Sequence, residues 1–451
     1  MRIDEISLRE VGSFDEARIT FPPGSDPERA DVYLLTGPNG SGKSTVLYSL
    51  ALALAAGFDS FGRDLGALRL RSGGSRVVVR DDGFSLAVAW PNENGHPRQT
   101  LALANGLQLH MLSGTPFCYY FGNASQPRPL FDHAQRAHYF TGVGPQAAES
   151  RFSWAAFAYA GSRSFDEVQV TAIREPTVGP FQNSLSFVQT ANASDFAHWV
   201  ANQEFKRLKA QEAGRQDKAD ALRRSIAHVE RVVSEIIEEP FSFVTSYDDN
   251  NVRAKVGDRT IDLGLLPDGL KSIVSWVADL LMRLDRIPWV DDTPPQDRAF
   301  LLLLDEVDIH LHPTWQRKVL PIVQRLFPNA QIIASTHSPF VVASAVDARI
   351  ITLGLHNGVA TVDRNEPADS GVSYSAILRS IFGIASEFDL DTEQKFQRFH
   401  ELKHRVLAGD LNASAEIEKL ALELAGRSEE VRELVALEQR QLARQLALKG
   451  A

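Results

Sequence analysis

Hydrophobic and polar positions alternate differently in different parts of the chain. Near the N-terminus, isolated apolar residues such as Ile3, Ile6 and Leu8 stand between polar ones, which predicts strands. The same two-residue period continues through residues 68–110 with turn signals between the runs, which predicts an antiparallel β-meander. In the second half, short apolar runs such as the leucines at 301–304 alternate with helical patterns. That alternation predicts a mostly parallel sheet with both faces covered.

Two further regions have a helical period. Residues 195–237 carry apolar faces at helical spacing, and Gly214 is expected to break them into a hairpin of two helices. Residues 391–448 are predicted to form charged amphipathic helices, which either pack on the rest of the chain or dock a partner. The apolar face expected for the last helix consists of Val431, Leu434, Val435, Leu442 and Leu446.

A glycine-rich loop stands between a predicted strand and a predicted helix. Its sequence, GPNGSGKST, fits the pattern G-x-x-x-x-G-K-[ST] in the required context. Glycines let backbone N–H groups wrap a phosphate, and the following helix N-terminus favours negative charge. We expect Lys43 to reach the β- and γ-phosphates of ATP and Ser44 to bind Mg²⁺. The predicted ATP-binding residues are Gly37, Asn39, Gly40, Ser41, Gly42, Lys43, Ser44 and Thr45.

A second motif, LLLLDEVDIHLHP, supplies the carboxylates that such a loop requires. The leucines predict a buried strand, and buried carboxylates at its end are costly unless they are used. Asp305 is predicted to bind Mg²⁺ together with Ser44, either directly or through water. Glu306 is then placed to polarise the water that attacks the γ-phosphate. Lys43 and Glu306 are therefore predicted to be catalytic residues.

With IIASTHSPF added, these motifs resemble a known family. The chain is similar to soluble ABC-type ATPases, both the SMC- and RecF-like heads and the ATPases of OLD and Septu-type PtuA phage-defence proteins. The resemblance is strong over residues 1–60 and 260–362 and loose in between. It implies an α/β fold, a P-loop NTPase head of ABC type. Such a head combines a mostly parallel sheet with an antiparallel β-meander, here with a helical insertion and a helical C-terminal tail.

The same resemblance implies roles for further residues. His337 corresponds to the switch histidine that contacts the γ-phosphate, which makes it the third predicted catalytic residue. Asp308 corresponds to the D-loop aspartate that crosses to a partner subunit. Arg163 stands where a glutamine loop is expected. The signature loop, which covers the partner's ATP, is matched with a proline in place of the usual serine. Its residues here are Leu266, Pro267, Asp268 and Gly269.

The patterns divide the chain into five expected regions. Residues 1–60 form an N-terminal ATPase lobe with the P-loop, and residues 61–194 form the β-meander with an irregular insertion. Residues 195–240 form the helical hairpin. Residues 241–365 form a second ATPase lobe that carries the signature loop, the acidic strand and the switch histidine, and residues 366–451 form the helical C-terminal region.

The histidine pair in HLHP allows two interpretations. His310 and His312 lie near Asp308 and could bind a metal ion. Alternatively, they shape the turn between strand and helix through local hydrogen bonds. The family resemblance favours the second interpretation, because HLHP recurs there as a structural element. Mg²⁺ is therefore the only ion expected, with ATP as the substrate.

Charge and cysteine content limit the function classes. The net charge of −10 argues against non-specific coating of nucleic acid, although a local patch could still bind DNA or RNA. Basic residues gather at 206–231, but interleaved acidic residues favour a solvated helix face. A single cysteine, Cys118, and the lack of a long apolar run indicate a cytoplasmic protein without a membrane partner.

The motifs predict ATP hydrolysis, and the family resemblance implies that it drives a conformational switch. Two heads of a homodimer, or of a higher homo-oligomer, would sandwich ATP, most simply in anti-phage defence with a separate nuclease as effector. The tail lacks a clustered acidic nuclease constellation, so a nuclease would be another chain. The alternatives are a RecF- or SMC-like DNA repair ATPase and, less well matched, the ATP-binding subunit of a membrane transporter.

Overall fold

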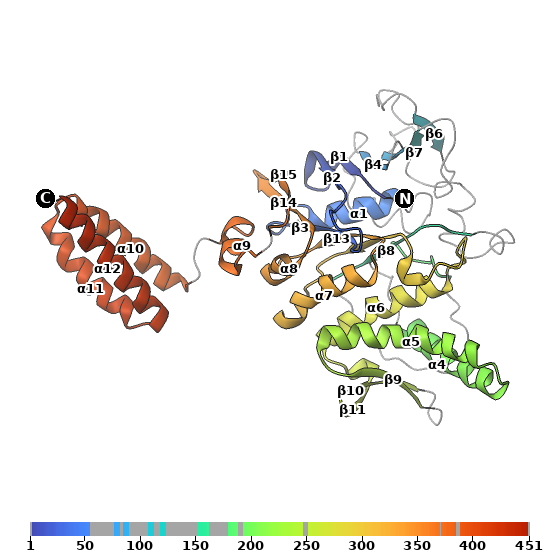
Figure 1. Ribbon diagram of the computed structural model, residues 1–451. Coiled ribbons are helices and arrows are strands. Elements are labelled where there is room, and N and C mark those ends of the chain that lie inside the picture. Colours follow the sequence, from blue (N-terminus) through green and yellow to red (C-terminus); the bar gives the residue numbers. More distant parts are fainter. Residues whose placement is uncertain are drawn as a thin grey trace. The chain divides into compact units, whose positions relative to one another are not determined.

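The computed structural model divides the chain into two units, Met1–Ile377 and Leu378–Ala451 (Figure 1). The structure describes residues 2–54, 76–81, 84–89, 107–111, 118–122, 151–161, 179–187, 193–246, 251–369, 371–384 and 388–449. No helix within these ranges is both long and apolar enough to cross a membrane. Each unit has a hydrophobic core of its own.

A six-stranded sheet forms the centre of the first unit. Its strand order is β15-β14-β3-β13-β12-β8, and all neighbours are parallel except β14 and β15. The central strands are buried on both faces, which explains why they read as continuous apolar runs. The strands span Asp31–Thr36 (β3), Ala155–Tyr159 (β8), Phe300–Leu304 (β12), Ala330–Ser335 (β13), Ala348–His356 (β14) and Val359–Pro367 (β15).

A second six-stranded sheet has the order β2-β1-β4-β5-β7-β6 and is antiparallel throughout. Its strands are Glu5–Val11 (β1), Phe14–Thr20 (β2), Arg76–Asp81 (β4), Phe84–Ala89 (β5), Leu107–Met111 (β6) and Cys118–Gly122 (β7). Helix α1, Lys43–Leu54, contacts strands of both sheets. Because it is covered on all sides, α1 is apolar all round rather than amphipathic. The predicted fold class, a parallel sheet with an antiparallel meander, is confirmed.

The helical insertion consists of α4, Ala193–Glu212, and α5, Gln216–Ile237, separated at Gly214 with φ +69°. A three-stranded antiparallel sheet packs against these helices (Figure 1). Its strands are Phe241–Ser246 (β9), Asn251–Val256 (β10) and Arg259–Asp262 (β11). The other helices described in this unit are Leu263–Leu265 (η2), Asp268–Arg286 (α6), Pro295–Asp297 (η3), Pro313–Leu326 (α7) and Pro339–Ser344 (α8). Helix α9, Tyr374–Ser380, includes the residues at which the two units divide.

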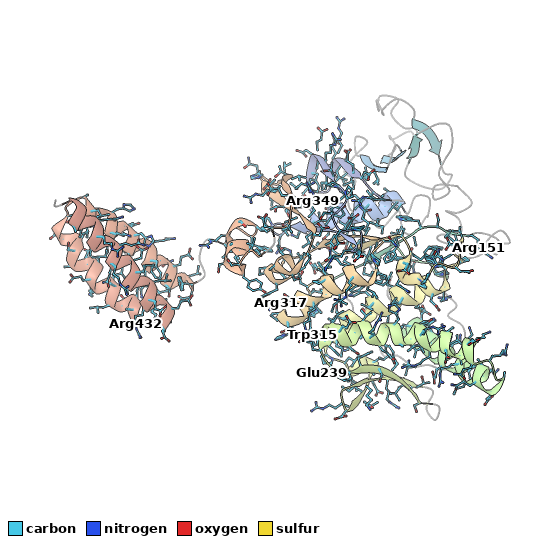
Figure 2. The ribbon with its side chains drawn as sticks, viewed as in Figure 1. Arg151, Glu239, Trp315, Arg317, Arg349 and Arg432 are labelled. Atoms are coloured by element: carbon cyan, nitrogen blue, oxygen red, sulfur yellow. The ribbon has the colours of Figure 1, made fainter. Side chains whose placement is uncertain are left out.

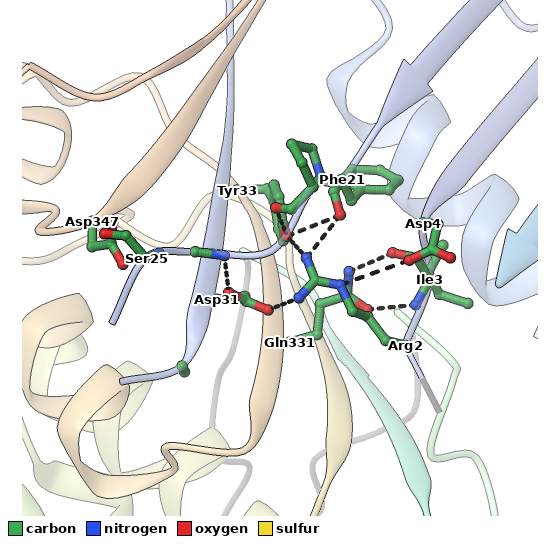
Figure 3. Close-up of polar contacts among 12 residues, drawn as sticks. Arg2, Ile3, Asp4, Phe21, Ser25, Asp31, Tyr33, Gln331 and Asp347 are labelled. Carbon is green, nitrogen blue, oxygen red and sulfur yellow. Dashed lines mark hydrogen bonds and ion pairs between the residues drawn. The ribbon is translucent and has the colours of Figure 1, made fainter. Parts of the chain in front are cut away.

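Polar contacts fix the amino ends of the parallel strands (Figure 3). The Gln331 side chain accepts from the Ile3 N–H at 2.8 Å and donates to the Ile3 carbonyl at 2.7 Å, which ties β13 to the chain before β1. Arg2 hydrogen-bonds Asp31 and Tyr33 of β3. These contacts occupy the amino ends of the strands. A ligand is therefore expected at the carboxyl ends, where open α/β sheets bind their ligands.

The second unit contains three helices, Leu390–Leu407 (α10), Leu411–Ala425 (α11) and Glu429–Lys449 (α12). Its core includes Phe399 and Leu424, both fully buried. The predicted apolar face of α12 is only partly correct. Val431, Val435 and Leu442 enter this core, whereas Leu434 and Leu446 are exposed, because the three-helix core covers a narrower stripe than the pattern indicated.

Candidate ATP-binding and hydrolytic site

The loop between β3 and α1 has the backbone that a phosphate-binding loop needs. Gly37, Gly40 and Gly42 all have positive φ, at +136°, +81° and +93°. A Cβ at Gly37 would lie 2.1 Å from the Leu353 carbonyl oxygen, and one at Gly42 would lie 2.4 Å from the Phe14 ring. Only glycine fits at either position, so the loop can wrap closely around an anion.

Lys43 at the start of α1 is buried within this loop. Its Nζ donates to the carbonyl oxygens of Gly37 and Pro38, at 2.8 and 2.9 Å. Burial lowers the pKa of the Lys43 ammonium, and the negative charges of Asp305, Glu306 and Asp308 oppose this shift. An ammonium that donates to neutral carbonyls in a buried loop gains most from an anionic partner, such as a phosphate.

Ser44 and Asp305 meet at the carboxyl end of the parallel sheet. Ser44 Oγ donates to Asp305 Oδ1 at 3.1 Å, although the two residues are 261 positions apart in the sequence. Octahedral Mg²⁺ with bonds of about 2.1 Å holds adjacent ligand oxygens about 3 Å apart, so a hydroxyl and a carboxylate at this spacing fit the ion. The spacing of these two oxygens fits the predicted Mg²⁺ site, which Ser44 and Asp305 would form.

Strand β12 presents Asp305 and Glu306 in sequence. The Asp305 N–H donates to the Tyr159 carbonyl oxygen of β8 at 2.9 Å, which continues the parallel pairing beyond the strand end. Glu306 then turns into the left-handed region at φ +48°, an uncommon conformation for a non-glycine residue. The turn directs its side chain away from the path of the strand, toward the same cavity as Lys43.

Ser335, at the end of β13, connects these two acidic residues. Its hydroxyl donates to Asp305 Oδ1 at 2.6 Å and accepts from the Glu306 N–H at 2.7 Å. Ser335 is fully buried. Sequence reasoning did not assign it a role, although it stands two residues before His337 in the STHSP motif and its position there was the available signal.

Asp308 and His337 lie on adjoining loops. Asp308 Oδ1 accepts from the Thr336 hydroxyl at 2.5 Å and from the His337 N–H at 3.3 Å. Asp308 thus holds the switch loop of its own chain, in addition to any role across a dimer. Partial burial and the nearby Lys43 charge lower the pKa of the His337 imidazole, opposed by Asp308, Glu306 and Asp305. The imidazole is therefore neutral at pH 7.

One cavity of about 680 Å³ brings these groups together. From the predicted ATP-binding set, Gly37 and Ser41 do not line it, and Ser41 is fully buried behind the loop. Gly12 and Ser13 of the β1–β2 turn also line the cavity and were not predicted. The other lining residues are Asn39, Gly40, Gly42, Lys43, Ser44, Thr45, Asp305, Glu306, Ser335 and His337. The cavity thus combines a phosphate-binding loop, a hydroxyl–carboxylate pair that fits Mg²⁺, a second carboxylate and a histidine. These are the groups that a nucleotide hydrolase needs.

Comparison with known proteins agrees with this geometry. A family model described as "AAA domain, putative AbiEii toxin, Type IV TA system" matches residues 155–343, and a second, "AAA domain", matches residues 5–80. The Septu protein PtuA of Bacillus thuringiensis is 24% identical over 408 residues, which are 85% of this chain and 84% of that protein. The chain is a P-loop ATPase that is similar to a Septu protein PtuA.

Two other similar proteins align with this chain over different shares of their own length. The retron Ec83 probable ATPase of Escherichia coli is 30% identical to this ATPase over 160 residues, which are 36% of this chain but only 28% of that protein. A solved structure of an SmcHead bound to the C-winged helix domain of ScpA aligns with 80% of this chain and 97% of its own. That alignment has a TM-score of 0.43 and 15% sequence identity.

The residues predicted to form the signature loop lie at the N-terminus of α6. Leu266 is buried, whereas Pro267 and Asp268 are exposed. Pro267 occupies the N-cap position without a side-chain hydrogen bond to the helix. A Cβ at Gly269 would lie 2.5 Å from the His310 carbonyl oxygen and 3.2 Å from the Trp315 ring, the latter labelled in Figure 2. The loop therefore packs on the DEVDIHLHP turn but does not line the cavity of its own chain.

The remaining predicted residues have different outcomes. His312 caps α7, since its Nδ1 accepts from the Thr314 N–H at 3.3 Å, and this matches the local hydrogen-bonding interpretation. On the basic helices, Arg207 pairs with Glu204 and Arg223 with Glu230, which matches the interpretation of a salt-bridged face for these residues. Arg163 lies outside the described residues.

Proposed function

We propose that this ATPase is a nucleotide-driven dimerisation switch, in which two copies of the chain enclose ATP between them. What supports the proposal is the separation of two parts within one chain. The cavity has Lys43, Glu306 and His337 on its walls, while Pro267 and Asp268 of the signature loop are exposed elsewhere. The exposed N-terminus of α6 offers unsatisfied N–H groups and a favourable dipole to the nucleotide of a second copy.

Within each half, the residues have distinct tasks. Lys43 exchanges its two backbone carbonyl partners for phosphate oxygens when ATP binds. Glu306 accepts a proton from the attacking water, and neutral His337 donates a hydrogen bond to the γ-phosphate. Ser44 and Asp305 would hold Mg²⁺, which would supply positive charge to balance the phosphates. Hydrolysis removes the γ-phosphate that joins the two halves, and the dimer opens.

We further propose a role in anti-phage defence, with a separate nuclease as the effector. The support is the similarity to Septu PtuA proteins and to a retron ATPase, together with the motif resemblance described above. A DNA repair ATPase of the RecF or SMC type is the second candidate. It shares the same site chemistry, so the partner that binds the ATP-bound state decides between the two.

Two substitutions test the ATPase mechanism. Glu306→Gln keeps the size of the side chain but removes the base, and turnover should fall by about 10²- to 10⁴-fold while ATP still binds. Lys43→Ala should lose ATP binding itself. Glu366→Gln, at an exposed position of β15, is the matched control and should hydrolyse ATP normally. Normal hydrolysis by Glu306→Gln would disprove the assignment of the base.

The partner is tested with the trapped state. Tagged Glu306→Gln protein is isolated from its native host with ATP and Mg²⁺, and bound proteins and nucleic acid are identified. A co-purifying nuclease supports the defence role, whereas DNA with repair proteins supports the second candidate. A stoichiometric integral membrane protein would overturn both and indicate a transporter motor.

A further inference from the structure

A glycine lies directly against the proposed catalytic base. Strand β8 ends at Tyr159, which pairs with the last residue of β12, and the chain continues to Gly161 beside Glu306. A Cβ placed on Gly161 would lie 2.6 Å from both Cβ and Oε2 of Glu306. Real Cβ atoms essentially never approach a neighbour within 3.0 Å, so any side chain at this position must displace Glu306.

The backbone of Gly161 does not itself require glycine. Its φ lies outside the left-handed region, unlike that of the phosphate-loop glycines. An alanine could therefore adopt the same backbone without strain. The close approach of the Glu306 side chain is the feature that an added methyl group would disturb.

Glu306 cannot move away without losing other contacts. Its N–H donates to Ser335 Oγ at 2.7 Å, and the next N–H, that of Val307, donates to the Ser335 carbonyl oxygen at 3.1 Å. Its own φ of +48° is already unfavourable, so these contacts hold it there. Ser335 fixes the backbone of Glu306 while the side chain lies over Gly161.

We propose that Gly161 is a positioning residue for Glu306. Because Gly161 has no side chain, the Glu306 side chain can occupy the space beside it, and from there its carboxylate reaches the attacking water. This inference rests on the proposed role of Glu306 as the base. A displacement of about 1 Å at a catalytic group can cost about 10²-fold in rate. Gly161 thus affects catalysis through the position of Glu306 without itself contacting the substrate.

The test is Gly161→Ala in the full chain, measured for turnover and for ATP affinity. Turnover should fall at least ~10-fold, toward ~100-fold, while the dissociation constant of ATP changes less than ~3-fold. Gly426→Ala is the matched control, because its Cβ would meet backbone no closer than 3.5 Å and its φ is −79°. In the Glu306→Gln background, Gly161→Ala should cause no further loss of turnover. An equal loss in that background would overturn the proposal.

A second background keeps the test valid if Gly161→Ala folds poorly. Glu306→Gly removes the atoms that the methyl group added by Gly161→Ala would meet, and glycine suits the positive φ. Gly161→Ala should therefore lower the melting temperature less there than in the wild type. An unchanged melting-temperature loss would show that another neighbour is responsible, and would overturn the proposal.

The two proposals fail in different ways. If Glu306→Gln alone hydrolyses ATP normally, the assignment of Glu306 as the base fails, and the present inference fails with it. If Glu306→Gln is inactive and Gly161→Ala is fully active, only the present inference fails.

Discussion

At the residue scale, the hydroxyl of Ser335 organises the acidic end of β12. It donates to the Asp305 carboxylate and accepts from the Glu306 backbone, and it is inaccessible to solvent. A buried donor or acceptor that loses its partner costs about 1–3 kcal/mol. One hydroxyl thus positions both the proposed Mg²⁺ ligand and the proposed base.

Ser335→Ala should therefore lower the free energy of unfolding by about 1–3 kcal/mol and reduce turnover more than ATP binding, since Lys43 is untouched. Urea denaturation and phosphate release measure the two effects. Ser344→Ala is the control, because its hydroxyl donates to the Val341 carbonyl within α8, away from the site. Equal effects of both substitutions on turnover would contradict the role of Ser335.

His337 gives a prediction for pH. Its folded-state pKa is lowered, mainly by burial and then by Lys43, so below pH ~6.5 the unfolded chain binds more protons at this position than the folded chain. The contribution of His337 to the free energy of unfolding should therefore decline as the pH falls from ~7.5 to ~5.5. Comparing wild type with His337→Gln by urea denaturation at both pH values measures this. A stability difference that is constant, or that grows at low pH, would contradict it.

The sequence predicted those site residues that belong to a continuous motif. The P-loop is one such motif between a strand and a helix, and DEVD and STHSP directly follow apolar strands. Gly161 and Ser335 act on Glu306 through strand pairing between distant segments, so no spacing rule reveals them. Gly12 likewise reaches the cavity only because the β1–β2 turn packs on Thr45.

At the element scale, α6 is anchored to the sheet by a buried polar group. Arg283 Nε donates to Asp279 Oδ2 at 2.6 Å. Arg283 Nη1 donates to the carbonyl oxygens of Pro180 and Gln182. The Tyr159 hydroxyl of β8 donates to Asp279 at 2.8 Å. The helix that begins at the signature loop is thereby tied to the strand that precedes Gly161. The sequence predicted an apolar helix here, but an Asp–Arg pair at i, i+4 is usually exposed, and only the fold shows that it is buried.

Arg283→Leu should lower the free energy of unfolding by about 3–5 kcal/mol, because Asp279 would remain buried without its partner charge. The double substitution Asp279→Leu with Arg283→Leu should recover part of this loss, since no unpaired charge remains. Chemical denaturation measures both variants. A double variant less stable than Arg283→Leu would contradict this account of the pair.

At the scale of the whole molecule, the chain combines an ATPase unit with a separate three-helix unit. The helical unit has its own core around Phe399, while large apolar residues such as Leu390 and Leu422 are 77% exposed. The sequence predicted its helices and only part of the buried face of α12, because three helices of similar pattern can pack in more than one way.

The isolated segment 388–449 should fold as a helical bundle with a cooperative thermal transition, since its apolar contacts lie within it. Phe399→Ala should cost about 3–5 kcal/mol, which a bundle this small would not survive. Leu422→Ala at an exposed site should change stability by less than about 0.5 kcal/mol. Circular dichroism measures all three. A segment that is unfolded alone would contradict an independent core.

The central claim is that ATP joins two copies of this chain. The most direct measurement is the mass in solution of the Glu306→Gln protein, by light scattering during size exclusion, with and without ATP and Mg²⁺. If ATP joins two copies, the mass should double only when ATP and Mg²⁺ are present, and Lys43→Ala protein should show no change. Glu306→Gln protein that binds ATP fully and keeps the same mass would contradict it.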